Sequence, residues 1–327
     1  MKDKIAFLVA IGNRIGTGHY RRMWNVNKYF RSKGVQTLFF AVSEVNSTQL
    51  EHEVMQLDEL GQLKDHLIEN KVEKIIIDIP ALYYYDPIFT TIRSLGVQIT
   101  WINDSAEARI QAGEKLISCS LNFDSQQSDD YVFYGLKYVI LNPLISELAS
   151  TQRMIQPKIK KVLVSFGGTD PNGITLRLLN LLDGMKGIWD NNLEIDVILG
   201  SSNIDLSSLH TDKFPYKMYV HQYIQDMAGK LLSSDLAFIS GGMTMYEACS
   251  LGTPSIIINQ NSEQNDEAAS FHNRGAVYNL GSYNQLNAVS LHDAITHIQG
   301  QTIREQMSKE AKSLIDGKGI ERIFQIV

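Results

Sequence analysis

The segment Ile239-Ser-Gly-Gly-Met-Thr-Met-Tyr-Glu-Ala-Cys-Ser-Leu-Gly-Thr-Pro254, with the apolar run 255–258 after it, predicts a strand–turn–helix–strand unit. Residues 236–239 form the expected buried strand, and residues 243–251 form an amphipathic helix. The Gly241-Gly242 pair between them is a turn that only glycine makes at low cost. Backbone N–H groups at the start of such a helix point at one spot and favour an anion such as diphosphate.

Glu247 lies one turn into this helix, where its carboxylate could accept two hydrogen bonds from neighbouring ribose hydroxyls. The segment therefore indicates a nucleotide site. An ordinary strand–turn–helix with Glu247 in solvent explains the same residues equally well.

Composition limits the classes of function. The 327 residues are enough for two domains, and a hydrophobic content of 44% with 20% charged residues is normal for a soluble globular protein. The net charge of −6 is spread evenly, because each half carries 15 basic and 18 acidic residues. Without a basic half, nucleic acid is not an expected partner.

The two cysteines, Cys119 and Cys249, lie in apolar segments, without a CxxC motif or a Cys/His cluster. We expect buried, reduced thiols in a cytoplasmic protein, with no disulfide framework, no metal site and no cofactor. The apolar run at residues 5–10 is too short for a signal peptide, and no segment approaches the length of a membrane span.

Strands and helices are predicted to alternate along the chain. In the first half, strands are expected at 5–10, 35–42, 74–79, 97–102, 116–121 and 138–141, and helices at 19–33, 57–70 and 86–95. In the second half, strands are expected at 162–166, 193–199, 218–220, 236–239, 255–258 and 277–280, with helices between them. This order predicts an α/β protein with two doubly wound parallel-sheet (Rossmann-like) domains facing a cleft.

The polar connector 150–160 sets the predicted boundary, giving an N-terminal domain of residues 1–150 and a C-terminal domain of residues 151–327. The tail, 303–327, reads as helical with no strand after it, so it could pack back on the first domain. Ligands of doubly wound sheets bind beyond the carboxyl ends of the strands, where the candidate residues gather.

In the first domain, Gly18 ends a glycine-containing loop and His19 begins a helix, whose dipole favours the neutral, base-competent imidazole. Asp78 and Asp104 follow two strands, and either could hydrogen-bond the imidazole and fix its tautomer. His19 as a surface residue and Asp78 as a turn cap are the alternatives. Arg22 could meet a phosphate or lie on a solvated helix face.

In the second domain, Gly168 and Thr169 repeat the strand–glycine–helix pattern, and the following Asp170 could simply cap the next helix. The segment 221–228 enters a helix directly after a strand, and its backbone could read the edge of a flat base. Glu263 and Gln264 open another helix and could touch a sugar hydroxyl, although acidic and amide residues are also ordinary at helix starts.

Together these motifs resemble one family. They are Gly16-x-Gly18-His19-x-x-Arg22, Ile75-Ile-Ile-Asp78, Asp104, Leu121-Asn122, Phe166-Gly-Gly-Thr-Asp170, Ser240-Gly-Gly-x-Thr244-x-x-Glu247 and Glu263-Gln264. Their order resembles the UDP-2,4-diacetamido-2,4,6-trideoxy-β-L-altropyranose hydrolases of pseudaminic acid biosynthesis and the related spore-coat polysaccharide proteins. These are similar in turn to the GT-B glycosyltransferases, and the resemblance runs over nearly the whole chain.

The resemblance implies a metal-independent UDP-sugar hydrolase with a GT-B fold that binds UDP in its C-terminal domain. His19 would be the general base that activates water, with Asp78 and Asp104 beside it. Glu247 would bind the ribose, Ile224 would meet the uracil through its backbone, and the turn residues Gly241, Gly242, Met243 and Thr244 would face the diphosphate. Gly18, Arg22, Asn122, Gly168, Thr169, Glu263 and Gln264 complete the implied substrate site.

This sequence departs from the family beside the acceptor site. Family members often carry Asp-Asp where Asn103-Asp104 stands, and Asp-Ser-Tyr or Asp-His-Tyr where Asp78-Ile79-Pro80 stands. A change there bears on which sugar binds and on whether the acceptor is water or a sugar hydroxyl. A GT-B glycosyltransferase with peripheral membrane contact therefore stays open as an alternative, as does a non-catalytic nucleotide-sugar-binding protein.

Overall fold

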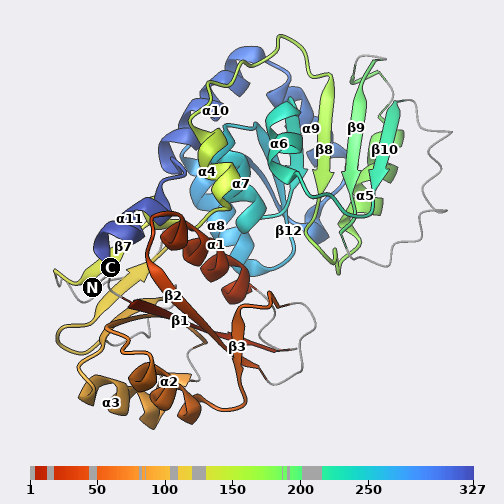
Figure 1. Ribbon diagram of the computed structural model, residues 1–327. Coiled ribbons are helices and arrows are strands. Elements are labelled where there is room, and N and C mark those ends of the chain that lie inside the picture. Colours follow the sequence, from red (N-terminus) through yellow and green to blue (C-terminus); the bar gives the residue numbers. More distant parts are fainter. Residues whose placement is uncertain are drawn as a thin grey trace. The chain divides into compact units, whose positions relative to one another are not determined.

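The computed structural model describes residues 4–12, 18–43, 50–80, 83–84, 86–103, 110–119, 130–185, 187–189, 192–200 and 216–327. The chain divides into two compact units. Unit 1 comprises Met1–Pro143 and Lys318–Val327, and unit 2 comprises Leu144–Gly317. Figure 1 labels many of the elements of each unit.

Unit 1 is built on a seven-stranded sheet in the order β3-β2-β1-β4-β5-β6-β7, in which each pair of neighbours is parallel. Its strands are β1 (Lys4–Ile11), β2 (Gln36–Ser43), β3 (Val54–Leu57), β4 (Lys74–Asp78), β5 (Gln98–Ile102), β6 (Lys115–Ser118) and β7 (Val132–Tyr134). Its helices are α1 (Gly18–Ser32), α2 (Leu63–Glu69), α3 (Pro87–Ser94) and α11 (Gly319–Ile326), with short 3-10 turns η1 (Leu60–Gln62) and η3 (Leu136–Tyr138).

The unit 1 sheet is buried on both faces, as the apolar run of β1 requires. Alternate residues of β1 point to opposite faces, so Phe7 meets Phe30 of α1 edge to face at 5.6 Å between ring centroids. Leu8 belongs to the cluster on the other face, together with Leu67 of α2 and Phe89 of α3. Figure 1 shows α1 on one side of this sheet and α2 and α3 on the other.

Two predictions in unit 1 are wrong. The segment 138–141, expected to be a strand, consists of the last residue of the 3-10 turn η3 and three residues outside any helix or strand, and the strand at this edge of the sheet is β7. The helix expected over 57–70 is shorter, because β3 occupies its first residue and η1 precedes α2. β3 is only four residues long and gains its strand form by pairing with Phe39 to Val42 of β2, which local sequence does not reveal.

Unit 2 is built on a six-stranded sheet in the order β10-β9-β8-β11-β12-β13, again parallel between all neighbours. Its strands are β8 (Lys161–Ser165), β9 (Glu194–Ile198), β10 (Lys217–His221), β11 (Leu236–Ile239), β12 (Ser255–Asn259) and β13 (Tyr278–Ser282). Its helices are α4 (Pro143–Ala149), α5 (Ile174–Asp183), α6 (Met227–Ser233), α7 (Met243–Leu251), α8 (Ser262–Asn273), α9 (Ala288–Ile298) and α10 (Gln301–Leu314), and η6 (Tyr283–Gln285) is a 3-10 turn.

The predicted strands of the second half are all present in this sheet, each within two residues of its expected bounds. Helices α5 and α9 pack into the main core cluster on one face, around Val164 of β8 and Phe238 of β11. Helices α6, α7 and α8 contact the sheet outside that cluster. Unit 2 is therefore a doubly wound sheet in which the β11–turn–α7 segment lies at the centre.

The sequence places the domain boundary between residues 150 and 151, whereas the two units divide between Pro143 and Leu144. Helix α4 groups with unit 2 because Gly317 packs so closely on it that a Cβ there would lie 2.9 Å from the Cβ of Ala149. The connector after α4 is held to unit 2 by Arg304, which is fully buried and donates to the carbonyls of Gln156 (2.9 Å) and Pro157 (3.0 Å).

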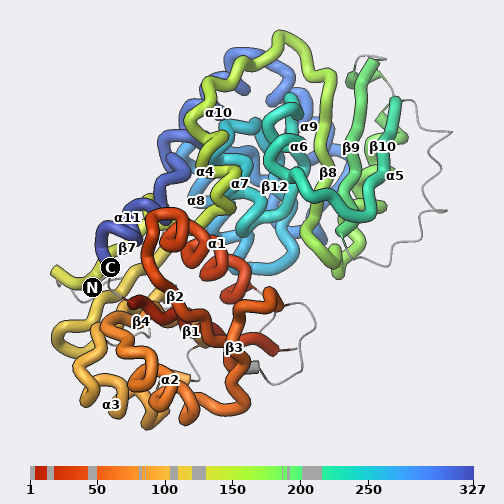
Figure 2. The backbone as a smooth tube through the Cα atoms, in the orientation of Figure 1, coloured from red at the N-terminus to blue at the C-terminus, as the bar shows by residue number. Residues whose placement is uncertain are grey.

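The C-terminal tail forms two helices, α10 in unit 2 and α11 in unit 1. In α11, Phe324 packs edge to face on Phe30 of α1 with ring centroids 4.9 Å apart, and Arg322 donates to the carbonyl of Lys137 at 2.8 Å. Figure 2 shows the blue tube of α11 beside the red tube of α1. The end of the chain is thus part of the first unit's structure.

Candidate functional site

In unit 1, three side chains meet at the carboxyl edge of the sheet. β4 ends at Asp78, and α1 presents His19 and Arg22, which share one helix face because they are three residues apart. His19 Nδ1 lies 2.6 Å from Asp78 Oδ1. Arg22 donates from Nε to Asp78 Oδ2 at 2.5 Å and from Nη2 to Asp78 Oδ1 at 2.7 Å. His19 and Arg22 of α1 therefore both bind the Asp78 carboxylate.

Asp78 is completely buried, whereas the side chains of His19 and Arg22 keep 28% and 19% of their surface exposed. Burial by itself would raise the pKa of the Asp78 carboxyl, but the charge of Arg22 and the hydrogen bonds from Arg22 and His19 outweigh it. The pKa of Asp78 accordingly lies below its ordinary value. Asp78 is thus a carboxylate at neutral pH and can only accept hydrogen bonds.

This arrangement fixes the tautomer of a neutral His19. Because Asp78 only accepts, the short Nδ1–Oδ1 contact requires the proton on Nδ1, and the lone pair then lies on Nε2. A part-exposed imidazole that is oriented by a buried carboxylate, and whose Nε2 has no partner among the described residues, has the geometry of a general base.

The sequence predicted that Asp78 could orient His19, but it did not predict that Arg22 would bind the same carboxylate. Arg22 is bound to Asp78 on both oxygens, so it does not lie on a freely solvated helix face, and its phosphate contact stays a prediction. Gly18 is exposed at the first position of α1. The predicted residues Asp104 and Asn122 lie outside the described residues, as does Gly16 of the same loop.

In unit 2, the predicted glycine turn connects β11 to α7. Gly242 has φ 93° and ψ −149°, a conformation that residues with a Cβ rarely adopt, and it is the residue that caps α7. Gly241 is needed for space, since a Cβ there would lie 2.8 Å from Asn259 Oδ1 and 2.9 Å from Gln264 Cβ. The two glycines let the chain turn tightly enough to aim the first N–H groups of α7 beyond the sheet edge.

Glu247 lies on the second turn of α7 and is part-buried. Among the residues that the structure describes, no group donates a hydrogen bond to its carboxylate or forms an ion pair with it. Burial raises the pKa of Glu247 from 4.5 to about 7. A part-buried carboxylate without a partner among these residues can accept hydrogen bonds from a ligand.

Gln264 of α8 lies beside the same turn. Its backbone N–H donates to the Asn261 side chain at 2.9 Å, which caps α8, and its Oε1 accepts from the Gln260 N–H at 2.9 Å. Its Nε2 is the nearest atom to the Cβ position of Gly242, at 3.9 Å, and so faces the turn. Glu263, by contrast, is exposed at the start of α8 with no contact to the turn among those described.

Met243 and Thr244 form the first turn of α7, with Met243 47% exposed and Thr244 part-buried. Both residues are thus open to a ligand at the helix start.

The loop after β8 places Gly168 and Thr169 at the surface. The N-cap residue of α5 is Gly173, not Asp170 as the sequence suggested, but the Asp170 carboxylate accepts from the N–H groups of Ile174 and Thr175, both at 2.9 Å. This loop is joined to the start of α8 by Gln260, whose Nε2 donates to the Phe166 carbonyl at 2.9 Å. The β8 and β12 loops are therefore tied together at the sheet edge.

Ile224 is part-buried in residues 222–226, which connect β10 to α6. The sequence predicted a helix starting directly after the strand, but α6 begins only at Met227, where the Asp226 side chain accepts from the Gly229 N–H at 2.7 Å. The segment before α6 is thus a loop with its backbone groups outside a helix.

Sequence reasoning missed the amide groups that support these loops. Asn259 is fully buried at the end of β12, and its Nδ2 donates to Asn279 Oδ1 at 2.8 Å and to the Gly281 carbonyl at 3.1 Å, both on β13. The run Asn259-Gln260-Asn261 directly after three isoleucines was the signal available, since amides at a strand end can tie loops together.

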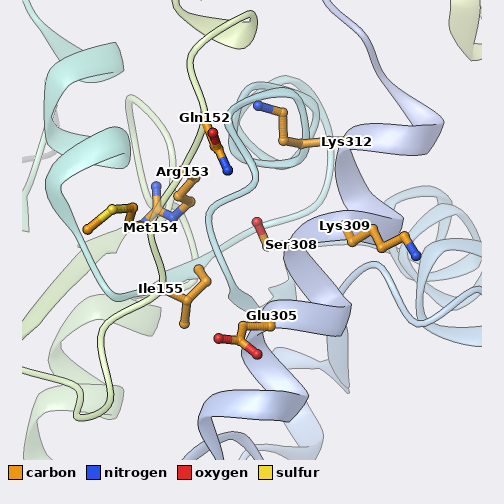
Figure 3. A pocket seen from close by; sticks show the side chains of 8 residues that line it. All are labelled: Gln152, Arg153, Met154, Ile155, Glu305, Ser308, Lys309 and Lys312. Carbon is orange, nitrogen blue, oxygen red and sulfur yellow. The ribbon is translucent and has the colours of Figure 1, made fainter.

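A cavity of about 630 Å³ lies elsewhere in unit 2, between connector residues 152–155 and α10 (Figure 3). None of the predicted site residues lines it. Its Arg153 donates to the Leu232 carbonyl at 3.0 Å, and its Lys312 donates to the Thr151 carbonyl at 2.8 Å. Figure 3 shows Lys309 pointing away from the connector. Arg153 and Lys312 thus hold the connector in place.

Within the described ranges, no three or more His, Cys, Asp or Glu side chains are grouped so as to hold a metal ion. No helix in that part of the chain is long and apolar enough to cross a membrane.

Two parallel-sheet α/β units in one chain define the GT-B class of fold, and solved structures confirm it. The chain is similar to MurG from Acinetobacter baumannii with a TM-score of 0.74 and 14% identity, covering 99% of both chains. It is also similar to a UDP-GlcNAc 2-epimerase from Neisseria meningitidis solved with UDP-GlcNAc, with a TM-score of 0.64 and 12% identity over 99% of both chains. The chain therefore has a glycosyltransferase-like fold.

Sequence comparisons add a matching domain family and curated relatives. Residues 166–323 match the glycosyltransferase family 28 C-terminal domain, which covers nearly all of unit 2 from the end of β8. The spore coat polysaccharide biosynthesis protein SpsG of Bacillus subtilis is 28% identical over 203 residues, or 62% of this chain. The chain spans 59% and 57% of the lengths of two curated relatives that it matches.

Proposed function

We propose that this protein is a UDP-sugar hydrolase, with UDP bound at the carboxyl edge of the unit 2 sheet. The nucleotide site is supported by the glycine turn before α7 and by the Glu247 carboxylate one turn further on, which has no partner among the described residues. The diphosphate would lie at the N–H groups of Met243 and Thr244, where the helix dipole favours negative charge. Two ribose hydroxyls would donate to Glu247.

The other predicted contacts complete this proposal. Gln264, whose Nε2 faces the turn, and Glu263 would contact the sugar, and Gly168 and Thr169 would face the phosphates from the neighbouring loop. Ile224 in the loop after β10 would meet the uracil through its backbone. The match of residues 166–323 to a glycosyltransferase C-terminal domain and the UDP-sugar complex of a structural relative support a UDP-sugar at this edge.

The proposed reaction is attack of water on the anomeric carbon. The water oxygen forms a bond to this carbon while the bond from the carbon to the phosphate oxygen breaks, and UDP leaves with the bonding electrons. His19 Nε2 takes the proton released by the water, and Asp78 stabilises the imidazolium that forms. The N-terminus of α7 stabilises the charge that builds up on the departing diphosphate.

His19 belongs to unit 1, and the proposed UDP site belongs to unit 2. Asp104 and Asn122 would complete the unit 1 part of the site, with Gly18 at the first position of α1, directly before the base. Arg22 would act indirectly, by holding Asp78 ionised and in place.

A glycosyltransferase is the second candidate, favoured by the family 28 match and by the MurG-like fold. The same donor site and base would then serve a sugar hydroxyl in place of water. Sequence similarity to a spore coat polysaccharide biosynthesis protein supports a role in surface polysaccharide assembly for either reaction. For the hydrolase, we propose a diacetamido-trideoxy sugar of nonulosonic acid synthesis as the substrate.

One experiment separates the two. The purified protein is incubated with UDP-2,4-diacetamido-2,4,6-trideoxy-β-L-altropyranose and with UDP-GlcNAc, without an acceptor, and release of UDP is followed. Turnover at about 1 s⁻¹ or faster on one of them is expected for a hydrolase. Release only after a glycan acceptor is added would identify a transferase, and no binding of any UDP-sugar would overturn both candidates.

A further inference from the structure

The loop 222–226 of unit 2 is held at both ends by one cluster of charged side chains. His221, the last residue of β10, precedes the loop, and Lys230 of α6 follows it. Both reach Asp196 in the middle of β9. His221 Nε2 lies 2.7 Å from Asp196 Oδ1, and Lys230 Nζ donates to the same oxygen at 2.7 Å.

The sheet register explains why these groups meet. Asp196 pairs with Tyr219 and Ile198 pairs with His221, so His221 lies two residues further along the same face as Asp196. Lys230 comes to this carboxylate from α6. The three side chains are only 20–31% exposed, so the ion pair and the hydrogen bond are partly protected from water.

We infer that Asp196, His221 and Lys230 are positioning residues that fix loop 222–226 so that its backbone reads the nucleotide base. The inference rests on the proposed UDP site and adds to it the origin of base selectivity. The loop itself needs such support, because Tyr223 is 77% exposed and Gln222, Gln225 and Asp226 also lie at the surface. Its fixed points are the cluster at its two ends and the cap of α6.

Fixing the loop matters for the choice between bases. Uracil presents an acceptor at O4 and a donor at N3, whereas cytosine presents a donor at N4 and an acceptor at N3. A rigid backbone that matches one pattern leaves polar groups unpaired against the other. A loosened loop can shift to satisfy either base. Loss of the cluster should therefore weaken the binding of UDP more than the binding of CDP.

The test is Asp196→Asn, which keeps the volume and removes the charge. Affinities for UDP and CDP are measured by titration calorimetry for the full-length wild type and variant. We expect UDP affinity to fall about tenfold while CDP affinity changes little, so that the UDP-to-CDP preference falls by about the same factor. With a UDP-sugar as substrate, KM rises while kcat is retained.

Glu194→Gln is the matched control. Glu194 is on the same strand, and its partner Lys217 lies 3.9 Å away at the opposite end of β10, far along the strand from the loop. This variant keeps the wild-type preference. Lys230→Arg retains the preference because it keeps the charge, and Lys230→Met loses it.

The outcomes separate this inference from the proposed function. A wild type that prefers UDP, with an Asp196→Asn variant that prefers it equally, overturns the inference and leaves the UDP site standing. Equal loss of UDP and CDP affinity also overturns it, since the cluster would then support the fold alone. A wild type that binds neither nucleotide overturns the proposed site and this inference together.

Discussion

The imidazole of His19 and the carboxylate of Asp78 come from positions 59 residues apart and meet at 2.6 Å. This contact joins the start of α1 to the end of β4, and the bidentate Arg22 completes it. Asp78 is thus both a structural anchor of unit 1 and the group that orients the proposed base. Substitutions at the three positions should separate these two roles.

Asp78→Asn should destabilise the protein by about 3–5 kcal/mol at pH 7, because it leaves the part-buried Arg22 cation without its carboxylate. The pKa of Asp78 is lowered in the folded state, so its stabilisation is fully present above the ordinary value of 3.8 and is lost as the pH falls through the folded value. Urea unfolding at pH 7 and at pH 3 measures both effects, and the difference between wild type and variant should narrow at pH 3.

Glu53→Gln is the control for this prediction, since Glu53 also pairs with an arginine of α1, Arg31, but at the surface. Loss of this ion pair should lower the free energy of unfolding by less than about 1 kcal/mol, as for other exposed pairs. Equal costs for the two variants would show that the Asp78 cluster is no stronger than a surface ion pair.

His19→Ala should lower kcat for UDP release by at least about 100-fold, since it removes the proposed proton acceptor. The affinity for UDP, measured by calorimetry, should stay within about twofold because the proposed UDP contacts all belong to unit 2. His292→Ala, at an exposed position on α9, should change neither quantity. A loss of UDP affinity in His19→Ala would mean that His19 was wrongly assigned as the base.

The fold could be predicted largely from the sequence, because parallel strands buried on both faces read as apolar runs such as those of β1 and β12. Glycines and prolines marked the turns. The errors fall where tertiary pairing decides the structure: β3 forms only against β2, and residues 138–141 end a 3-10 turn and form no strand. The break between α10 and α11 at Gly317 also depends on a contact with α4.

The site could be predicted only as separate pieces. The glycine turn and Glu247 are local in sequence, and their geometry follows from the strand–turn–helix pattern. Of the pairings across long sequence distances, the sequence predicted that of His19 with Asp78 as one possibility, but not those of Arg22 with Asp78 or of Lys230 with Asp196, 34 residues away. A charged residue in a motif has many possible partners, and only the fold decides which one it meets.

Gly241→Ala should disturb the turn before α7, because the added methyl group would lie 2.8–3.0 Å from Asn259 and Gln264. Both neighbours are held by hydrogen bonds, so we expect a loss of about 1–3 kcal/mol in stability and at least tenfold weaker UDP binding. Gly184→Ala adds the same group at the end of α5, at an ordinary 3.4 Å contact and with φ −70°, and should be nearly neutral. Full UDP affinity in Gly241→Ala would remove the turn from the proposed site.

Glu247→Gln should stabilise the ligand-free protein at pH 8 and have little effect at pH 4.5. Burial raises the folded pKa of Glu247 from 4.5 to about 7, so the cost of its buried charge appears as the pH rises through this window. The amide carries no charge, and the gain at pH 8 is on the order of 2–3 kcal/mol at most. Thermal unfolding at the two pH values measures it, and an equal shift at both would argue against a buried charge as the cause.

The affinity of wild type for UDP should rise between pH 6 and pH 8. Hydroxyl groups that donate to Glu247 favour its charged form, and below a pKa of about 7 binding must first remove the proton from this carboxyl. Each pH unit below this pKa lowers the affinity for UDP by about tenfold. Glu247→Gln should bind UDP more weakly at pH 8 and show only the pH dependence that UDP itself brings. Calorimetry at pH 6, 7 and 8 compares the two proteins, and parallel curves would exclude Glu247 from the ribose site.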